Sequence, residues 1–410
     1  MSAYRSLFSL LSSYGILLIA NGLFGTIVSI RSKTEAFPDS IIGVVLSGYF
    51  AGLLLSSFYA ARVVASIGHI RAFALFASVA STVALGHLLW VNPTLWGVFR
   101  VISGFCMGGM IVVTEGWLNE RAGNHNRGRI MSAYMITTYA CAGSAQLIMM
   151  WNSPDGFKLF VFVSILYSLS LIPILVTRSQ TPALPKPNRP NIWRLYKISP
   201  VGMIGSFTVG YVNGIFYSLA PVFAYNLGLN PQQTAIFIAI AIMSGMLLQL
   251  PLGKLSDHID RRWVMIFSAT MTTLACYLLF SNDGSNPTTL YLCGLFYGSV
   301  GFSINPVCVA HVNDLTSNDE RTQTSGGLLM TYGIGAVIGP ILAGFVMKNG
   351  SQYIFMMSGI ATLLLAFYTL LRLWQKPRHQ QKKRRFRAFA VQSPARKFGF
   401  SSREQSSVQK

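Results

Sequence analysis

Long apolar stretches alternate with short polar ones over almost the whole chain. Each apolar stretch holds about 20 residues, the length an α-helix needs to cross the hydrocarbon core of a bilayer. Because backbone groups in lipid must be hydrogen-bonded within their own segment, helices are the expected structure. The twelve stretches are residues 7–30, 41–61, 72–91, 95–117, 130–151, 158–177, 199–225, 232–252, 263–281, 289–312, 323–347 and 352–372. The pattern predicts an all-α membrane protein with twelve transmembrane helices.

One polar segment interrupts this pattern near the middle of the chain. Residues 178–198 hold four prolines and five basic residues, a composition typical of a semi-rigid, extended linker. We therefore divide the chain into an N-terminal six-helix bundle (1–177), this linker, a C-terminal six-helix bundle (199–372) and a basic tail (373–410). The tail is expected to be disordered.

The net charge of +20 would suggest nucleic acid in a soluble protein, but here it has a simpler explanation. Of the 32 lysines and arginines, 27 fall on one side of the predicted membrane, 4 on the other, and Arg100 lies within a helix. The basic side is the cytoplasmic one, so both termini are expected in the cytoplasm. The tail either binds anionic membrane lipid or merely reinforces this topology. Nucleic acid is not expected as a partner, because no folded domain accompanies the basic tail.

Residue types that hold metals or cofactors are scattered. All five cysteines lie inside apolar stretches, and no Cys-x-x-Cys motif or Cys/His cluster occurs. The chain also lacks the Gly-x-x-x-x-Gly-Lys motif of nucleotide-binding loops. We therefore expect no metal, no cofactor and no ATPase of its own.

The two halves of the chain resemble each other at offsets of 192 to 194 residues. The segment Asn21-Gly22-Leu23-Phe24 recurs as Asn213-Gly214-Ile215-Phe216, and three further matches follow in the same order. Six predicted helices separate the members of each pair, so the bundles should be related by a pseudo-twofold axis along the membrane normal. Such repeats place a substrate site near mid-membrane, between the halves, and act by alternating access.

A charged motif follows the eighth predicted helix, formed by Gly253, Asp257, Asp260, Arg261 and Arg262. It resembles the loop signature of the major facilitator superfamily of secondary transporters. The resemblance implies a gating loop.

Asp257 is expected to pair with a basic residue or to cap the fifth helix near Arg129, where the helix dipole favours an anion. Such a contact would latch the cytoplasmic side shut. The corresponding loop of the first half has Ala61 and Ala65 in place of the glycine and the acid.

Helix 4 carries Arg100, Gly104 and Gly108 at a spacing of four, similar to the helix-4 arginine motif of many exporters in this superfamily. A charge inside a span is costly and indicates function by default. Snorkelling to the outer head groups is the alternative. Helix 11 carries a glycine-proline motif around Pro340 that such exporters usually have in helix 5, which lacks proline here. Drug–proton antiport is therefore not implied.

Glu115 is the only acid predicted to lie inside a span. A carboxyl group removed from water binds a proton more readily, which suits proton coupling. Pairing with a basic residue such as Arg129 or Arg62 is the alternative. Arg100 and His311 are the other candidates for proton coupling, and an ordinary interior hydrogen bond is the alternative for His311.

Asn21 and Asn213 are polar residues deep in helices 1 and 7. Those helices, with helices 4 and 10, line the cavity in the resembled family, so both asparagines are expected to contact the substrate. Interhelical hydrogen bonds are the alternative role. Further candidates are Tyr134, Tyr139, Asn305 and Tyr332.

The stretches that begin at Glu115 and at His311 are similar to a poorly characterised bacterial branch of the superfamily. The resemblance implies a multi-pass protein of the cell inner membrane and supplies no substrate. We expect a monomeric secondary active transporter of a small solute, driven by protons if Glu115 carries them. A polytopic membrane enzyme or a non-transporting receptor on the same fold are the alternatives. An enzyme would need a cluster of His, Asp or Cys, and none appears beyond His311 with Asp314.

Overall fold

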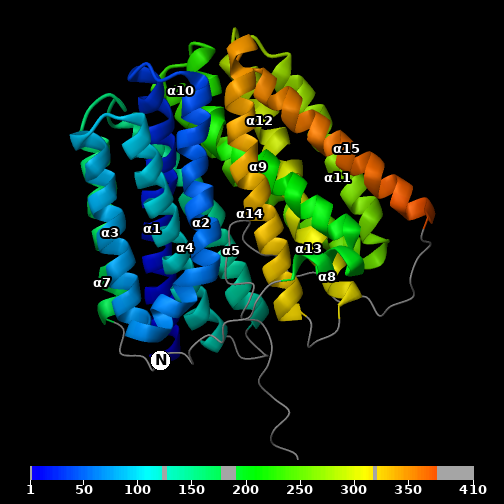
Figure 1. Cartoon of the computed structure of the whole chain (residues 1–410), viewed down its shortest axis with the longest axis horizontal. Coiled ribbons are helices and arrows are strands. Elements are labelled where there is room, and N and C mark those ends of the chain that lie inside the picture. Colours follow the sequence, from blue (N-terminus) through cyan, green and yellow to red (C-terminus); the bar gives the residue numbers. More distant parts are fainter. Residues whose placement is uncertain (1, 122–126, 177–190, 317–320, 376–410) are drawn as a thin grey trace, which may run out of the picture.

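Apart from one or two residues at its ends, every predicted apolar stretch lies in one helix or in two consecutive helices (Figure 1). The computed structural model describes residues 2–121, 127–176, 191–316 and 321–375, and the side chains of 7–118, 130–176, 191–316 and 324–375. Within these residues no strand occurs. The helices are α1 (Ser2–Thr34), α2 (Asp39–Ile67), α3 (His69–Leu89), α4 (Pro93–Arg121), α5 (Arg127–Leu147), η1 (Ile148–Met150), α6 (Lys158–Leu169), α7 (Leu171–Val176), α8 (Ile192–Ile198), α9 (Pro200–Asn226), α10 (Pro231–His258), α11 (Arg261–Phe280), α12 (Pro287–Gly301), α13 (Ile304–Leu315), α14 (Arg321–Val346), η2 (Met347–Asn349) and α15 (Tyr353–Gln375).

In the described part of the chain, 11 helical segments are long and apolar enough to cross a membrane. The helix α5, at the fifth predicted span, is not among them, because residues such as Thr137, Thr138 and Gln146 lower its hydropathy. It nevertheless packs within the bundle, against α1 and α10. The predicted all-α membrane fold is confirmed.

Several helices begin where the sequence places helix-breaking residues. Before α10, Asn230 accepts a hydrogen bond from the backbone N–H of Gln233 at 2.8 Å, and the Gln233 side chain accepts one from the Asn230 N–H at 3.0 Å. Pro231 occupies the first turn, where its missing N–H leaves no partner unsatisfied. Ser199 likewise accepts from the N–H of Gly202 at the start of α9. These caps fix the tight turns between consecutive helices.

The prediction of an extended linker is wrong for its last residues. They form α8, capped by Asn191, whose side chain accepts a hydrogen bond from the Arg194 N–H at 3.0 Å. Leu195 is buried in a small apolar cluster with residues of α13 and α14, and this burial stabilises the helix. The rest of the linker and the tail beyond Gln375 lie outside the described residues.

Two predicted spans are each divided into two α-helices. The sixth breaks at Ser170, between α6 and α7, and the tenth breaks near Phe302, between α12 and α13. Pro173 and Pro306 follow these breaks, and each lacks the N–H that would bond the carbonyl four residues earlier. Proline alone is not sufficient, since α9 continues through Pro221. The apolar pattern could not reveal the breaks because hydropathy stays high across them.

The helices of the two halves pack in the same way. The helix α2 packs along α4 as α10 packs along α12, α1 packs on α5 as α9 packs on α14, and α3 packs on α6 as α11 packs on α15. In Figure 1 the blue and cyan helices gather on one side and the orange and yellow-green helices on the other. The internal repeat of the sequence is therefore present in three dimensions.

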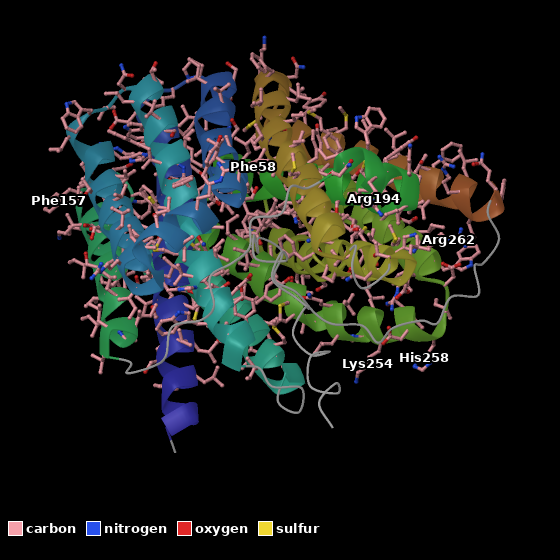
Figure 2. All side chains as sticks on the ribbon, turned by 60° about the horizontal axis from the view of Figure 1, so that its bottom comes forward. Phe58, Phe157, Arg194, Lys254, His258 and Arg262 are labelled. Carbon is pink, nitrogen blue, oxygen red and sulfur yellow. The ribbon has the colours of Figure 1, made fainter. Side chains whose placement is uncertain are left out.

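The halves meet through α2 with α14, α5 with α10, and α1 with α9, and the repeat exchanges the first two pairs. We call the end at which α1 begins the basic end, because Arg194, Lys254, His258 and Arg262 lie there (Figure 2).

At the opposite end, α2 and α14 come close enough that a Cβ on Gly43 would lie 2.3 Å from the carbonyl oxygen of Pro340 and 3.0 Å from the Cα of Gly344. Ser29 donates a hydrogen bond to the carbonyl of Ser218 at 2.9 Å, between α1 and α9. The halves are therefore in close contact at the end away from the basic one.

Backbones touch inside each half as well. A Cβ on Gly104 would lie 1.9 Å from the carbonyl oxygen of Tyr49, and a Cβ on Gly298 would lie 1.8 Å from that of Ala241. These two contacts are equivalent under the repeat. Small residues at such points allow helices in lipid to associate by close packing, where no hydrophobic drive brings them together.

Replacing Gly104 with alanine is expected to destabilise the protein by about 1–3 kcal/mol, because α2 and α4 must separate to admit the methyl group. Gly97→Ala on the same helix is the matched control, since nothing lies within 4 Å of its Cβ position. Thermal unfolding of the purified protein in detergent measures both. Equal midpoints for the two variants would contradict the packing argument.

Candidate substrate cavity

A cavity lies between the two halves, bounded by α1, α2, α4, α5, α9 and α10. Its water-accessible volume is about 90 Å³. Ser29 and Ser218, which are hydrogen-bonded to each other, belong to its lining, so it lies next to the closed end. Three of the predicted site residues line it, namely Asn21, Arg100 and Tyr139.

Arg100 is the charged residue of this cavity. Its side chain is only 4% exposed, and its guanidinium carbon lies 5.1 Å from the ring centre of Phe24 and 4.9 Å from that of Tyr49. Its Nε and Nη1 atoms are buried without a hydrogen-bond partner in the described structure. None of the ion pairs found among the described residues includes it. The side chain is thus held between two rings inside the bundle.

Other polar side chains of the first half surround the same space. Thr26 donates a hydrogen bond to Oε1 of Gln146 at 2.6 Å, which ties α1 to α5. The Tyr49 hydroxyl lies beside Asn21 but outside hydrogen-bond geometry, and the Tyr139 hydroxyl is buried without a partner among the described residues. Polar groups that lack a hydrogen-bond partner can bind a solute, because the entering solute supplies the missing partner.

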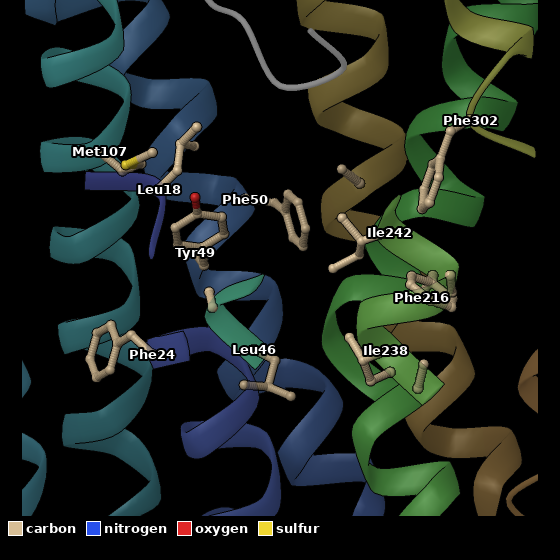
Figure 3. Close-up of a cluster of buried hydrophobic side chains, with 14 of the residues drawn as sticks. Leu18, Phe24, Leu46, Tyr49, Phe50, Met107, Phe216, Ile238, Ile242 and Phe302 are labelled. Atoms are coloured by element: carbon tan, nitrogen blue, oxygen red, sulfur yellow. The ribbon is translucent and has the colours of Figure 1, made fainter. Parts of the chain in front are cut away.

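The side of the cavity formed by the second half differs from the side formed by the first half. Its lining residues are mainly apolar and come from α9 and α10. Figure 3 shows Phe216, Ile238 and Ile242 across from Tyr49 and Phe50. The cavity therefore joins a charged and polar wall to an apolar one.

Glu115 lies outside the lining but is connected to it. The carboxylate is 6% exposed and accepts a hydrogen bond from the hydroxyl of Tyr134. The Tyr134 ring stacks on that of Tyr14 with centres 4.7 Å apart, and the Tyr14 hydroxyl lies 3.2 Å from the Thr138 hydroxyl. Because Tyr14 lines the cavity, two aromatic rings separate Glu115 from it.

The remaining predicted residues are not part of the lining. Asn213 donates a hydrogen bond to the hydroxyl of Tyr332 at 3.3 Å, between α9 and α14. Asn305 is buried at the start of α13, where neither atom of its amide finds a partner within the described residues. His311 lies near the charged side chains at the basic end. The structure thus brings Asn213 and Tyr332 together and leaves both outside the lining that contains Asn21.

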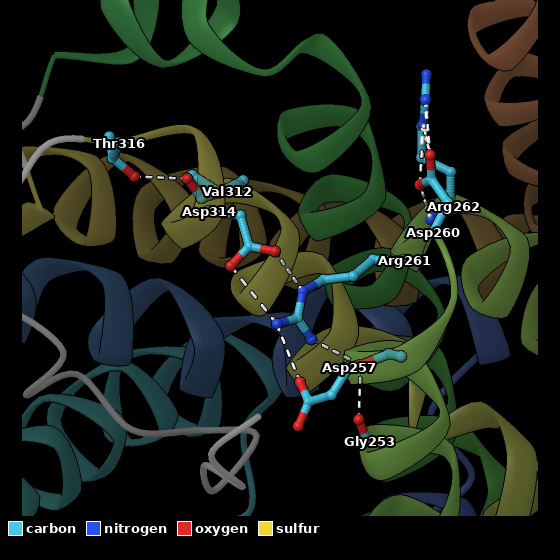
Figure 4. Close-up of polar contacts among 9 residues, drawn as sticks. Gly253, Asp257, Asp260, Arg261, Arg262, Val312, Asp314 and Thr316 are labelled. Carbon is cyan, nitrogen blue, oxygen red and sulfur yellow. Dashed lines mark hydrogen bonds and ion pairs between the residues drawn. The ribbon is translucent and has the colours of Figure 1, made fainter. Parts of the chain in front are cut away.

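Arg261 organises the predicted gating loop (Figure 4). Its side chain is 2% exposed, and it bonds Asp314 of α13 at 2.6 Å, Asp257 of α10 at 3.1 Å and the Ser256 hydroxyl at 2.7 Å. The Ser256 hydroxyl in turn donates to the carbonyl of Gly253. One arginine therefore joins α10, α11 and α13.

Arg262 forms a second pair in the loop, with Asp260 at 2.7 Å, and donates a hydrogen bond to the Arg372 carbonyl of α15. Partial burial would raise the pKa of Asp260, but the hydrogen bonds and charge of Arg262 outweigh it and hold the pKa below its usual value. The side chain of Arg129, the expected partner of Asp257 across the halves, lies outside the described residues.

A model of the Major Facilitator Superfamily matches residues 10–248 and 202–406, which together span both halves. The chain belongs to the major facilitator superfamily. The resemblance predicted from the loop after the eighth helix is confirmed. Membership makes the chain a multi-pass membrane protein and points to a secondary transporter rather than an enzyme.

Similar curated proteins in this superfamily are themselves uncharacterised. An uncharacterised MFS-type transporter of Enterobacter sp. (strain 638) is 26% identical over 92% of this chain and 97% of its own length. The MFS-type transporter YcaD of Escherichia fergusonii is 26% identical over 92% and 98%. The predicted kinship with a poorly characterised bacterial branch is confirmed.

Solved structures of the superfamily share the fold. The nucleoside transporter NupG superposes with a TM-score of 0.78 at 16% identity, covering 90% of this chain and all of NupG. A D-xylose-proton symporter superposes with a TM-score of 0.66 at 16% identity, covering 89% and 95%. At these identities the likeness extends to the architecture alone.

The sequence analysis missed several members of the cavity. Gln146 carried a usable signal, since a polar amide inside an apolar stretch is unusual. Tyr14 and Tyr49, which line the cavity, and Phe24, which lies against Arg100, carried none, because aromatic residues are common in membrane helices and their roles depend on which helices face each other. Only the packing of α1 and α2 beside α4 brings the rings of Phe24 and Tyr49 to Arg100.

Replacing Arg261 with glutamine is expected to destabilise this superfamily member by about 2–3 kcal/mol, because Asp257 and Asp314 would lose their shared partner. Arg62→Gln is the matched control, since Arg62 is exposed and lies over the Tyr59 ring, a contact of about 1 kcal/mol or less. Chemical unfolding in detergent compares them. If Arg261→Gln lowers the free energy of unfolding no more than Arg62→Gln does, the ion pairs of Arg261 contribute little to stability.

Proposed function

We propose that the chain is a secondary active transporter that moves a small solute through the central cavity by alternating access. The observation that carries the proposal is the cavity itself, which lies between repeated halves and is lined by the unpaired polar atoms of Arg100 and Tyr139. The moving bodies are the bundles 1–177 and 199–372. A monomer suffices, because one chain supplies both walls.

The contacts at the closed end suit such a motion. They are made by small residues, Gly43 against Gly344 and Ser29 against Ser218. Small side chains do not interlock, so the halves can separate there with few broken contacts. In the opposite state of the transport cycle, the two halves would close at the basic end, where the loop of Arg261 and Asp257 provides charged contacts.

Glu115 is the preferred proton carrier. An ionised Glu115 accepts the hydrogen bond of Tyr134, whereas a protonated carboxyl group can donate instead. Tyr134 and its stacked neighbour Tyr14 would pass this change to the cavity wall. Arg100 is a weaker candidate because an arginine side chain does not lose its proton in proteins. His311 is weaker because it lies near the loop instead of the cavity.

Glu115→Gln is expected to abolish concentrative transport while leaving downhill exchange, because the carboxamide cannot carry a proton. A metabolite-wide comparison of vesicles with and without the protein identifies the solute, and its accumulation is then followed with and without a proton gradient. Glu35→Gln, which removes a partly exposed partner of Arg31, is the matched control. Undiminished accumulation after both Glu115→Gln and collapse of the gradient would reject proton coupling.

We propose further that the protein lies in the cell inner membrane with its basic end, and both termini, in the cytoplasm. The exposed basic residues at that end support this orientation, since cytoplasmic loops of membrane proteins are enriched in lysine and arginine.

An impermeant thiol reagent applied to right-side-out vesicles is expected to label Asp283→Cys and to spare Lys254→Cys. Both side chains are exposed, and they lie at opposite ends of the bundle, Asp283 in the turn after α11 and Lys254 near the C-terminal end of α10. Inverted vesicles should give the reverse pattern, and the unmodified protein provides the background of its own cysteines. Labelling of Lys254→Cys from outside would overturn the orientation.

A further inference from the structure

We propose that the transported solute is a small organic anion with an apolar body, bound by its carboxylate to Arg100. The inference rests on the transport function proposed above and names the chemical class of its solute. Two observations carry it, namely the buried charge of Arg100 and the unlike walls of the cavity.

The positive charge of Arg100 needs an anion to neutralise it. Arginine stays protonated in proteins, and a buried charge without a partner is strongly unfavourable. The rings of Phe24 and Tyr49 recover part of this energy, but they lie beside the guanidinium carbon and leave Nε and Nη1 without acceptors. No Asp or Glu belongs to the cavity lining among the described residues.

A carboxylate fits the open positions of this guanidinium. Each forked edge of a guanidinium pairs Nη2 with either Nε or Nη1, so a carboxylate can bind through both of its oxygens at an edge that includes one of the two unpartnered atoms. Asn21 and the Tyr139 hydroxyl line the same cavity and can donate further hydrogen bonds to an anion. Phe24 and Tyr49 fix the plane of the guanidinium, so the site is arranged before the solute enters.

The wall from the second half defines the rest of the solute. Phe216, Ile238 and Ile242 (Figure 3), together with Pro221, offer carbon surface, whereas Tyr217 and Ser218 carry the two hydroxyl groups of this wall. Solute hydroxyl groups placed against the four carbon side chains would lose their water partners without replacement. A solute rich in hydroxyl groups, such as a free sugar, is therefore disfavoured, and a ring or branched alkyl chain is favoured. The volume of about 90 Å³ limits that body to a small one.

The test compares acids with their neutral amides. Calorimetric titration of the full-length protein in lipid nanodiscs at neutral pH uses benzoate, phenylacetate and 4-methylpentanoate against benzamide, phenylacetamide and 4-methylpentanamide. At least one acid is expected to bind about tenfold or more tightly than its amide, because only the acid neutralises the guanidinium. Amides that bind as tightly as the acids would overturn the proposal, and so would the absence of binding by every acid.

Variants assign the preference to its residue. Arg100→Gln is expected to abolish the ratio of acid to amide affinity, and Arg100→Lys to keep part of it. Arg62→Gln, an exposed arginine over a tyrosine ring, should leave the ratio unchanged. Ile242→Ser should weaken an acid and its amide by the same factor, which keeps the test informative if Arg100→Gln does not fold. A ratio that survives in folded Arg100→Gln would overturn the assignment.

Flux measurements separate this proposal from the function on which it rests. Tight acid binding without movement of that acid into proteoliposomes would remove the transport function and leave the anion site standing. Transport of neutral solutes only, with the acids excluded, would keep the transport function and reject the anion site.

Discussion

Close backbone contact between helices is the constraint on which the rest of this structure depends. In lipid, apolar side chains gain little by leaving their surroundings, so helices associate through packing, and glycine permits the closest packing. Gly104 against Tyr49 and Gly298 against Ala241 bring the same pair of helices together in each half. Two firm bundles result, and the central space arises because six of their helices face each other without filling it.

The two bundles have the same arrangement of helices but carry different side chains at equivalent positions. The first half supplies Arg100, Tyr49 and the amide of Gln146 to the cavity, whereas the second half supplies mainly carbon. At the basic end the difference is reversed, since Arg261 there joins two acids, whereas the first-half loop has Ala61 and Ala65 in place of its glycine and acid. The repeat sets the positions of helices, and the side chains at equivalent positions have diverged.

Hydropathy alone predicted the helices, because it is a property of long segments, and short sequence matches at offsets of 192 to 194 residues predicted the repeat. Hydropathy missed the breaks near Ser170 and Phe302 and the helix α8, which depend on single prolines and on the burial of Leu195. For the cavity, the position of Arg100 could be predicted from its charge inside an apolar run. Its environment could not, because Phe24 and Tyr49 come from two other helices and nothing in their local sequence marks them.

The cluster around Arg100 has a mechanical consequence. Arg100, Phe24 and Tyr49 come from α4, α1 and α2, so the charged part of the site moves as one piece with a single half. If the halves rock as proposed, the head group of the proposed anion would keep its surroundings, and the contact of its body with α9 and α10 would open. Water that enters along this carbon surface would then reach the guanidinium and replace the solute in its hydrogen bonds, so wetting of one wall would precede rupture of the ion pair.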